Sequence, residues 1–262
     1  MGLINWGLVR EYFTNNFTEK IDADGDEFKE LTPVLYRWTH GATDKDLGDG
    51  LLIYSAIQYM RAKTCVCLGS GGGFIPRLMS QARMDLHDHE IFTGKKQMEW
   101  GDIGTTILVD ACNGINGVTD WPPANSFLRT HFGCKMIIAS TEYAFYNYFV
   151  KEDIKIDYLH IDAGHSYENV KQDFDLYSTI LSENGIISIH DTDASYEKEH
   201  IKVNDFDDEE DDTWNEYSNG PSQVVKEIRE NPEWEVFNFF NNGILREKPA
   251  STGLTFIQRC KK

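Results

Sequence analysis

An aspartate, a glycine and a histidine follow a short apolar segment in the middle of the sequence. The segment, residues 156–161, has the length and the β-branched content of a buried strand, and Asp162, Gly164 and His165 come directly after it. In an open α/β sheet, ligands bind just beyond the carboxyl ends of the strands. His165 is the best candidate for a general base, because its unperturbed pKa lies near neutrality. In the alternative interpretation, Asp162 caps the helix that begins near Tyr167, and His165 is a solvated loop residue.

A second carboxylate, Asp191, follows the next strand along the chain, which is predicted over residues 185–190. If the two strands are neighbours, Asp162 and Asp191 lie together, and two like charges repel unless a cation or a proton lies between them. Carboxylate oxygens and water are the ligands that suit Mg²⁺. We therefore expect a Mg²⁺-type site at Asp162 and Asp191. His190 is an unusual magnesium ligand, so its role as a third ligand, a residue behind the ligands or a substrate contact stays open.

A glycine-rich turn, residues 69–73, follows the first predicted strand and precedes a helix. Glycines let the backbone approach a ligand closely, and the N-terminus of the helix offers free N–H groups to acceptor atoms. The turn lacks the third glycine of the dinucleotide fingerprint. Asp110 ends the next strand, where a carboxylate can accept both hydroxyls of a ribose, although it could also be an exposed strand end. The residues expected to bind a nucleoside-like cofactor are Gly69, Ser70, Gly71, Gly73 and Asp110.

Hydroxyl groups follow the third predicted strand, residues 135–139. Ser140 and Thr141 could contact the edge of an adenine or cap the next helix, and capping is the favoured interpretation. We retain Thr141, together with Asp162, among the candidate cofactor contacts.

The elements that must position these residues follow from the hydrophobic pattern. Residues 1–63 are expected to be a helical extension, with helices over 8–17, 27–38 and 50–61. From there on, short apolar strands alternate with helices, which is typical of a mainly parallel sheet with helices on both faces. No helix fits between the last two strands, so we expect them to be antiparallel. The seven strands are predicted over residues 64–68, 105–109, 135–139, 156–161, 185–190, 234–239 and 254–258.

After the helical extension, the sequence indicates one α/β domain over residues 64–262, with no linker that would separate a further domain. Two insertions lengthen this domain, at residues 81–104 and 193–219. The first contains His87 and His89, which could ligate a metal from a loop, although polar residues of an insertion are more often solvated.

Composition limits the classes of function. The 43 acidic and 25 basic residues give a formal net charge of −18, which repels nucleic acids and anionic lipid surfaces. Seven of these carboxylates lie in residues 205–212, a run typical of a solvated, mobile loop. The five cysteines lie mostly in apolar segments, which indicates reduced thiols. Because the sequence has neither a signal core nor a membrane-spanning apolar segment, we expect a cytoplasmic protein without a membrane partner.

These residues resemble those of the class I S-adenosylmethionine-dependent methyltransferases. The sequence is most similar to the divalent-metal-dependent O-methyltransferases, in the branch with the macrocin and mycinamicin O-methyltransferases and the cephalosporin-hydroxylase-like proteins. The resemblance covers roughly residues 45–260 and is most specific over residues 156–175, 185–192 and 220–228. It implies a Rossmann-like seven-stranded sheet, mainly parallel with an antiparallel last strand.

The resemblance also implies roles for individual residues. The glycine turn would line the methionine and ribose end of S-adenosyl-L-methionine, and Asp110 would hold the ribose hydroxyls. Asp162 and Asp191 would be metal ligands, and His165 would take the proton from the acceptor hydroxyl. The sequence departs from the family at Cys67 and His190, where many relatives have acidic residues.

The expected function is therefore methyl transfer from S-adenosylmethionine to a hydroxyl group of a small molecule, assisted by Mg²⁺. In the alternative interpretation, the chain keeps this fold but only binds a nucleoside or a partner. A nicotinamide-dependent oxidoreductase is less favoured, because the glycine spacing does not fit it. The acceptor and the formation of a homo-oligomer stay open.

Overall fold

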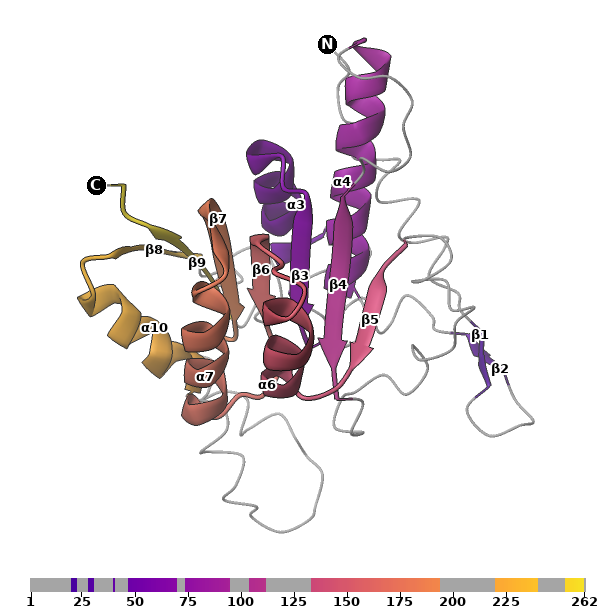
Figure 1. Ribbon diagram of the computed structural model, residues 1–262. Coiled ribbons are helices and arrows are strands. Elements are labelled where there is room, and N and C mark those ends of the chain that lie inside the picture. Colours follow the sequence, from indigo (N-terminus) through magenta and orange to yellow (C-terminus); the bar gives the residue numbers. More distant parts are fainter. Residues whose placement is uncertain are drawn as a thin grey trace, which may run out of the picture.

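The computed structural model describes residues 20–22, 28–30, 40, 47–69, 74–94, 104–111, 133–193, 220–239 and 253–261. Their main feature is a seven-stranded sheet with the order β5-β4-β3-β6-β7-β9-β8 (Figure 1). Its strands are β3 (Thr64–Leu68), β4 (Thr105–Asp110), β5 (Lys135–Ile138), β6 (Ile156–Ile161), β7 (Leu181–His190), β8 (Trp234–Phe239) and β9 (Leu254–Arg259).

The sheet is mixed. Strands β5, β4, β3, β6 and β7 pair in parallel, so that their carboxyl ends lie at the same edge. Strand β9 lies between β7 and β8 and is antiparallel to both. Numbered by their order in the chain, the seven strands are arranged 3-2-1-4-5-7-6. The predicted mainly parallel sheet with an antiparallel last strand is therefore confirmed.

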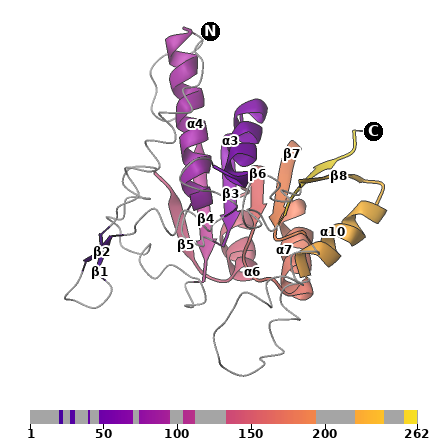
Figure 2. The ribbon, with the colours of Figure 1, turned by 180° about the vertical axis from the view of Figure 1, so that it is seen from behind.

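Helices cover both faces of the sheet, as Figures 1 and 2 show from opposite sides. The first face carries α3 (Asp49–Met60) and α4 (Phe74–Phe92). The second face carries α6 (Thr141–Ala144), the π-helix η2 (Phe145–Val150), α7 (Tyr167–Ser178) and α10 (Gly220–Glu230).

The alternation of side chains along β3 shows how the core divides between these faces. Cys65 and Cys67 pack among the buried residues of α3 and α4, whereas Val66 and Leu68 pack among those of the opposite face. A central strand that is apolar on both sides is what a doubly covered parallel sheet requires. The apolar strand predicted from the sequence is thus buried on both faces.

The segment before the sheet differs in part from the helical extension that the pattern predicts. Helix α3 confirms the predicted helix over residues 50–61, with its start one residue earlier. Strands β1 (Lys20–Asp22) and β2 (Phe28–Glu30) form a separate antiparallel pair, so the predicted helix over residues 27–38 is wrong at its start. Asp24-Gly25 separates these strands in the sequence, and such a pair favours a turn over a continuous helix. The predicted helix over residues 8–17 lies outside the described residues.

Helix α4 also changes the interpretation of the first insertion. The helix continues to Phe92, so His87 and His89 lie on a helix and not on a loop. His87 is buried and His89 is exposed, because residues two positions apart on a helix point in different directions. In the part of the chain that the structure describes, neither residue belongs to a group with metal-ligand spacing. Most of the second insertion, with its acidic run, lies outside that part.

None of the helices among the described residues combines the length and the apolar character needed to cross a membrane.

Candidate active site

The site lies at the carboxyl ends of β6 and β7. These strands are parallel neighbours with Ile161 opposite Ile189, so the residues that follow, Asp162 on one strand and His190-Asp191 on the other, are side by side. This arrangement confirms the adjacency that the sequence predicts. Asp191 has a φ of 57°, in the left-handed region that residues other than glycine rarely adopt. Such backbone conformations cluster at functional sites.

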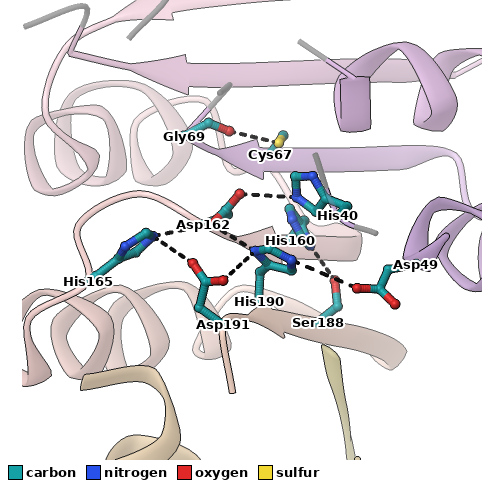
Figure 3. A network of polar contacts seen from close by, with 10 residues as sticks. All are labelled: His40, Asp49, Cys67, Gly69, His160, Asp162, His165, Ser188, His190 and Asp191. Carbon is teal, nitrogen blue, oxygen red and sulfur yellow. Dashed lines mark hydrogen bonds and ion pairs between the residues drawn. The ribbon is translucent and has the colours of Figure 1, made fainter. Parts of the chain in front are cut away.

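His165 bridges the two carboxylates (Figure 3). Its Nε2 lies 3.3 Å from Oδ1 of Asp162 and 3.3 Å from Oδ2 of Asp191. The next residue, Ser166, is the N-cap of α7, and its hydroxyl accepts a hydrogen bond from the N–H of Asn169. The alternative in which Asp162 caps this helix is therefore wrong, and its carboxylate faces the histidines.

The surroundings of His165 make it a stronger base than a free imidazole. Burial lowers the pKa of His165, but the hydrogen bond to Asp162 and the charge of Asp191 outweigh burial and raise this pKa above its ordinary value. Burial raises the pKa of Asp162, but the nearby histidines hold that pKa well below its usual range. Asp162 is consequently an ionised carboxylate.

His190 contacts three carboxylates. Its Nδ1 lies 3.5 Å from Oδ1 of Asp162 and 3.2 Å from Oδ1 of Asp191. Its Nε2 lies 3.8 Å from Oδ2 of Asp49, at the start of α3. Burial lowers the pKa of His190, yet the charges of Asp191 and Asp162 raise it well above the ordinary value. His190 therefore belongs to the same polar network as the predicted ligands.

Two further histidines belong to this network, and neither was predicted as a site residue from the sequence. His40 places its Nε2 3.1 Å from Oδ2 of Asp162, and its ring lies 4.1 Å from that of His190 between centroids. No strand-end pattern marks His40, because it lies before the sheet begins. His160 is fully buried on β6, and its Nδ1 lies 2.8 Å from Oγ of Ser188. The sequence does contain a signal for His160, because it is a histidine inside an apolar strand. It lies two positions before Asp162 and therefore on the same face of the strand.

Gly69 and Asp110 lie at the ends of β3 and β4, next to the site. Gly69 has a φ of 80°, and its N–H donates to the carbonyl of Val109 over 2.9 Å. The buried Sγ of Cys67 donates to the carbonyl of Gly69 over 3.0 Å. Asp110 is partly buried. Ser70, Gly71 and Gly73 lie outside the described residues, so the contacts of the turn with a cofactor stay a prediction.

The hydroxyl groups after β5 have structural partners. Ser140 caps α6 by accepting from the N–H of Tyr143 over 3.3 Å, which confirms the favoured interpretation. The carbonyl of Thr141 accepts from the hydroxyl of Tyr177 over 2.8 Å, and its side chain hydrogen-bonds to Asp173. Thr141 thus joins α6 to α7, and its contact with a cofactor stays a prediction.

The residues of the network fit a divalent cation. Among the described residues, two groups have ligand atoms within 4.8 Å of one another: Asp162 with His165 and Asp191, and His40 with Asp162 and His190. The carboxylates supply the charge and the oxygen atoms that a hard cation such as Mg²⁺ requires. The imidazoles add nitrogen ligands, which suit borderline transition metals. These ligand atoms are therefore compatible with a bound metal ion. They include imidazole nitrogens, whereas the site expected for magnesium consists of oxygen atoms alone.

Part of the chain is similar to a known family. Residues 66–192 match the model of a family described as a methyltransferase domain. No curated protein matches the chain significantly in sequence.

Similar folds occur among solved structures. The O-methyltransferase TomG from Streptomyces achromogenes, in complex with S-adenosylmethionine, is 10% identical over 100% of both chains, with a TM-score of 0.56. An O-methyltransferase from Bacillus cereus, in complex with S-adenosylhomocysteine, is 13% identical over 85% of this chain and 84% of that chain, with a TM-score of 0.55. The S-adenosylhomocysteine-bound methyltransferase PaMTH1 from Podospora anserina is 15% identical over 81% of this chain and 78% of that chain, with a TM-score of 0.50. The chain thus has the seven-stranded fold of these methyltransferase structures, and residues 66–192 match the model of a methyltransferase domain.

Proposed function

We propose that this protein transfers a methyl group from S-adenosylmethionine to a hydroxyl group of a small molecule, with a divalent cation among Asp162, His190 and Asp191. The observation that carries the proposal is the position of His165, whose Nε2 lies 3.3 Å from both aspartates at the carboxyl edge of the sheet. A base and two carboxylates at this edge fit proton removal from a bound hydroxyl better than they fit ligand binding alone.

Two features support S-adenosylmethionine as the methyl donor. The matched methyltransferase domain includes the glycine turn, Asp110 and the site aspartates. The structures of similar fold from Streptomyces achromogenes, Bacillus cereus and Podospora anserina contain S-adenosylmethionine or S-adenosylhomocysteine. In this chain, Gly69 brings the backbone at the end of β3 against Asp162, so the start of the glycine turn lies next to this carboxylate.

An oxygen acceptor is supported by the chemistry of the site. The similar proteins from Bacillus cereus and Streptomyces achromogenes are O-methyltransferases. A hydroxyl is a weak nucleophile until it loses its proton, and His165 lies where it can accept that proton. The surplus of acidic residues disfavours polyanionic acceptors, which agrees with a small hydroxylated molecule.

The residues suggest the following reaction. His165 accepts the proton of the acceptor hydroxyl at Nδ1, while its Nε2 stays paired with Asp162 and Asp191, which hold the ring in position. The oxygen attacks the methyl carbon, so a C–O bond forms as the C–S bond breaks, and the sulfonium sulfur becomes a neutral thioether. When bound, a divalent cation supplies positive charge that stabilises the acceptor oxygen as it is deprotonated. No covalent enzyme intermediate is needed, and the site acts through positioning and charge.

Isothermal titration of the purified protein with S-adenosylmethionine and S-adenosylhomocysteine, each with and without Mg²⁺, tests this proposal. We expect saturable binding of both compounds, followed by turnover in a screen of hydroxylated acceptors. Asp191→Asn should retain cofactor binding and lose metal-stimulated turnover, whereas Glu230→Gln, an exposed change at the far end of α10, should match the wild type.

Three results would contradict parts of the proposal. Absence of cofactor binding in every condition would exclude the reaction. Saturable binding without turnover across the acceptor screen would favour the alternative of a nucleoside-binding protein. Full activity of Asp162→Asn and Asp191→Asn in the presence of a chelator would exclude the metal.

A further inference from the structure

We propose that His40, Asp162 and His190 bind a divalent transition metal, such as Mn²⁺, Fe²⁺, Co²⁺ or Zn²⁺, in preference to Mg²⁺. The inference deepens the proposed function, on whose metal site it rests, because it places His40 in the ligand set with Asp162 and His190, instead of Asp191, and names the class of the cation. Figure 3 shows the three side chains, which come from the segment before the sheet and from the ends of β6 and β7, directed toward one another.

The distances among the three residues fit common coordination to one cation. Nε2 of His40 lies 3.1 Å from Oδ2 of Asp162, and Nδ1 of His190 lies 3.5 Å from Oδ1 of the same residue. Nitrogen and oxygen atoms bound to one metal at ~2.1 Å are themselves about 3–3.5 Å apart. One ligand atom from each of the three residues lies within 4.8 Å of the others, so the side chains are close enough to converge on one cation.

The ligand types favour a transition metal. Mg²⁺ is bound through oxygen atoms and retains several waters, whereas imidazole suits zinc, iron, nickel and copper. Two histidines and one carboxylate, with further coordination positions open, make up a set that binds metals such as Fe²⁺.

The residues around His190 and His40 match the support that metal-binding histidines usually have. A ligating histidine typically donates its second N–H to a carboxylate, which fixes the ring and its tautomer. Nε2 of His190 faces the carboxylate of Asp49 at 3.8 Å, and Asp49 is buried. The backbone N–H of Asp49 also donates to the carbonyl of His40 over 2.8 Å. The start of α3 thus holds both histidines.

His160 gives an independent indication of a ligand. It is fully buried, and its ring centroid lies 5.6 Å from that of His40 and 6.3 Å from that of His190. Its Nδ1 pairs with Ser188, but its Nε2 has no hydrogen-bond partner among the described residues. A buried polar atom without a partner is costly, and native structures usually supply one. A hydrated metal among the histidines would bring water molecules that can satisfy this nitrogen.

Metal binding to the chelator-treated full-length protein tests the inference without any assay of activity. We expect Zn²⁺ and Co²⁺ to bind with a stoichiometry of about one and at least ~10-fold more tightly than Mg²⁺ in isothermal titration, as the ligand types predict. Bound Co²⁺ should show visible d–d absorption that reports its ligands.

The variants separate the ligands from other buried histidines. His40→Gln should weaken Co²⁺ binding and change its visible spectrum, and Asp49→Asn should weaken binding by about 10–100-fold, as loss of a supporting carboxylate does. His87→Gln is the matched control, because His87 is also buried but lies on α4 and outside the two groups of ligand atoms. It should leave affinity and spectrum unchanged. Thermal unfolding of each metal-free variant shows whether it folds.

The inference is overturned if Mg²⁺ binds as tightly as Co²⁺, or if a folded His40→Gln protein binds Co²⁺ with the affinity and spectrum of the wild type. The proposed function fails separately. Transition-metal binding without S-adenosylmethionine binding would uphold this inference and remove the methyl transfer, whereas cofactor binding with turnover that responds to Mg²⁺ alone would do the reverse.

Discussion

Gly69 lies directly against the backbone of Asp162. A Cβ added to Gly69 would be 2.0 Å from the carbonyl oxygen of Asp162, far below any real contact. The N–H of Asp162 in turn donates to the carbonyl of Leu68 over 2.9 Å. The start of the glycine turn and the central carboxylate are therefore coupled through the backbone, so a change at one moves the other.

Gly69→Ala is expected to destabilise the protein and to weaken metal and cofactor binding together. The positive φ alone costs roughly 1–2 kcal/mol for an L-residue. The clash with Asp162 adds to this cost. The measurement is the free energy of unfolding in urea, with ligand titrations alongside. Gly94→Ala is the control, because Gly94 has a φ of 69° with nothing within 4 Å of the added Cβ. Equal losses in the two variants would show that the contact with Asp162 is not important.

His165→Asn is expected to lower kcat by about 10²–10⁴-fold, the contribution typical of a general base, while S-adenosylmethionine binding persists. The measurement is kcat together with the Kd of the cofactor. His89→Asn, an exposed change on α4, should leave both unchanged. A His165→Asn protein with wild-type kcat would remove the base from the mechanism.

Gly220→Ala should act on the same base from a distance. A Cβ on Gly220 would lie 2.2 Å from the carbonyl oxygen of His165 and 2.4 Å from the carbonyl carbon of Ser166, so the turn after β6 must shift. We expect a lower kcat with little change in cofactor affinity, because the cofactor region is not displaced. Gln223→Ala, at an exposed position of the same helix, is the control. A change confined to thermal stability would contradict the positioning role.

Asp173 gives the protein a pH-dependent stability. Burial raises the pKa of Asp173 to about 7, and the hydrogen bond from Thr141 only partly opposes this. In the unfolded chain, this carboxyl loses its proton near pH 4. Between about pH 4 and 7, the folded state therefore binds more protons than the unfolded state, and stability falls as the pH rises.

Asp173→Asn should remove this loss of stability at higher pH, because asparagine has no proton to release. Relative to the wild type, the variant should gain up to about 4 kcal/mol at pH 8, which is the energy of a shift of about three pKa units, and the gain should vanish below pH 4. Urea denaturation across this pH range measures it. Asp175→Asn, at an exposed position of the same helix, should show no comparable pH-dependent gain. A constant difference between Asp173→Asn and wild type at all pH values would contradict the assignment.

The sequence predicted the elements whose signals are local. The strands β3, β6 and β8 begin and end where the apolar pattern does, because glycine or polar residues bound the apolar segments. Asp162 and Asp191 were predictable as neighbours, since consecutive parallel strands often pair. Strand β7 begins four residues earlier than predicted, at Leu181, because Glu183 and Asn184 have the polarity of a turn although they lie within the strand.

The features that were missed depend on long-range contacts. His40 joins Asp162 and His190 only after the chain has folded, and nothing in its neighbouring residues marks a site. The π-helix η2 also has no simple pattern, because Phe145 and Phe149 are placed by packing against Tyr177. His87 was misplaced because a polar segment was taken as a loop, although it continues the helical spacing of the buried residues of α4.

The position of β9 has a consequence for the order in which the sheet comes apart. Among the described strands, β8 pairs only with β9, whereas β9 also pairs with β7. Any local unfolding that releases β9 therefore also frees β8, but β8 can detach while β9 remains in place. The amide hydrogens of β8 that bond to β9 should therefore exchange with solvent at least as fast as those of β9 that bond to β7. The strands are expected to detach from the sheet in the order β8, then β9.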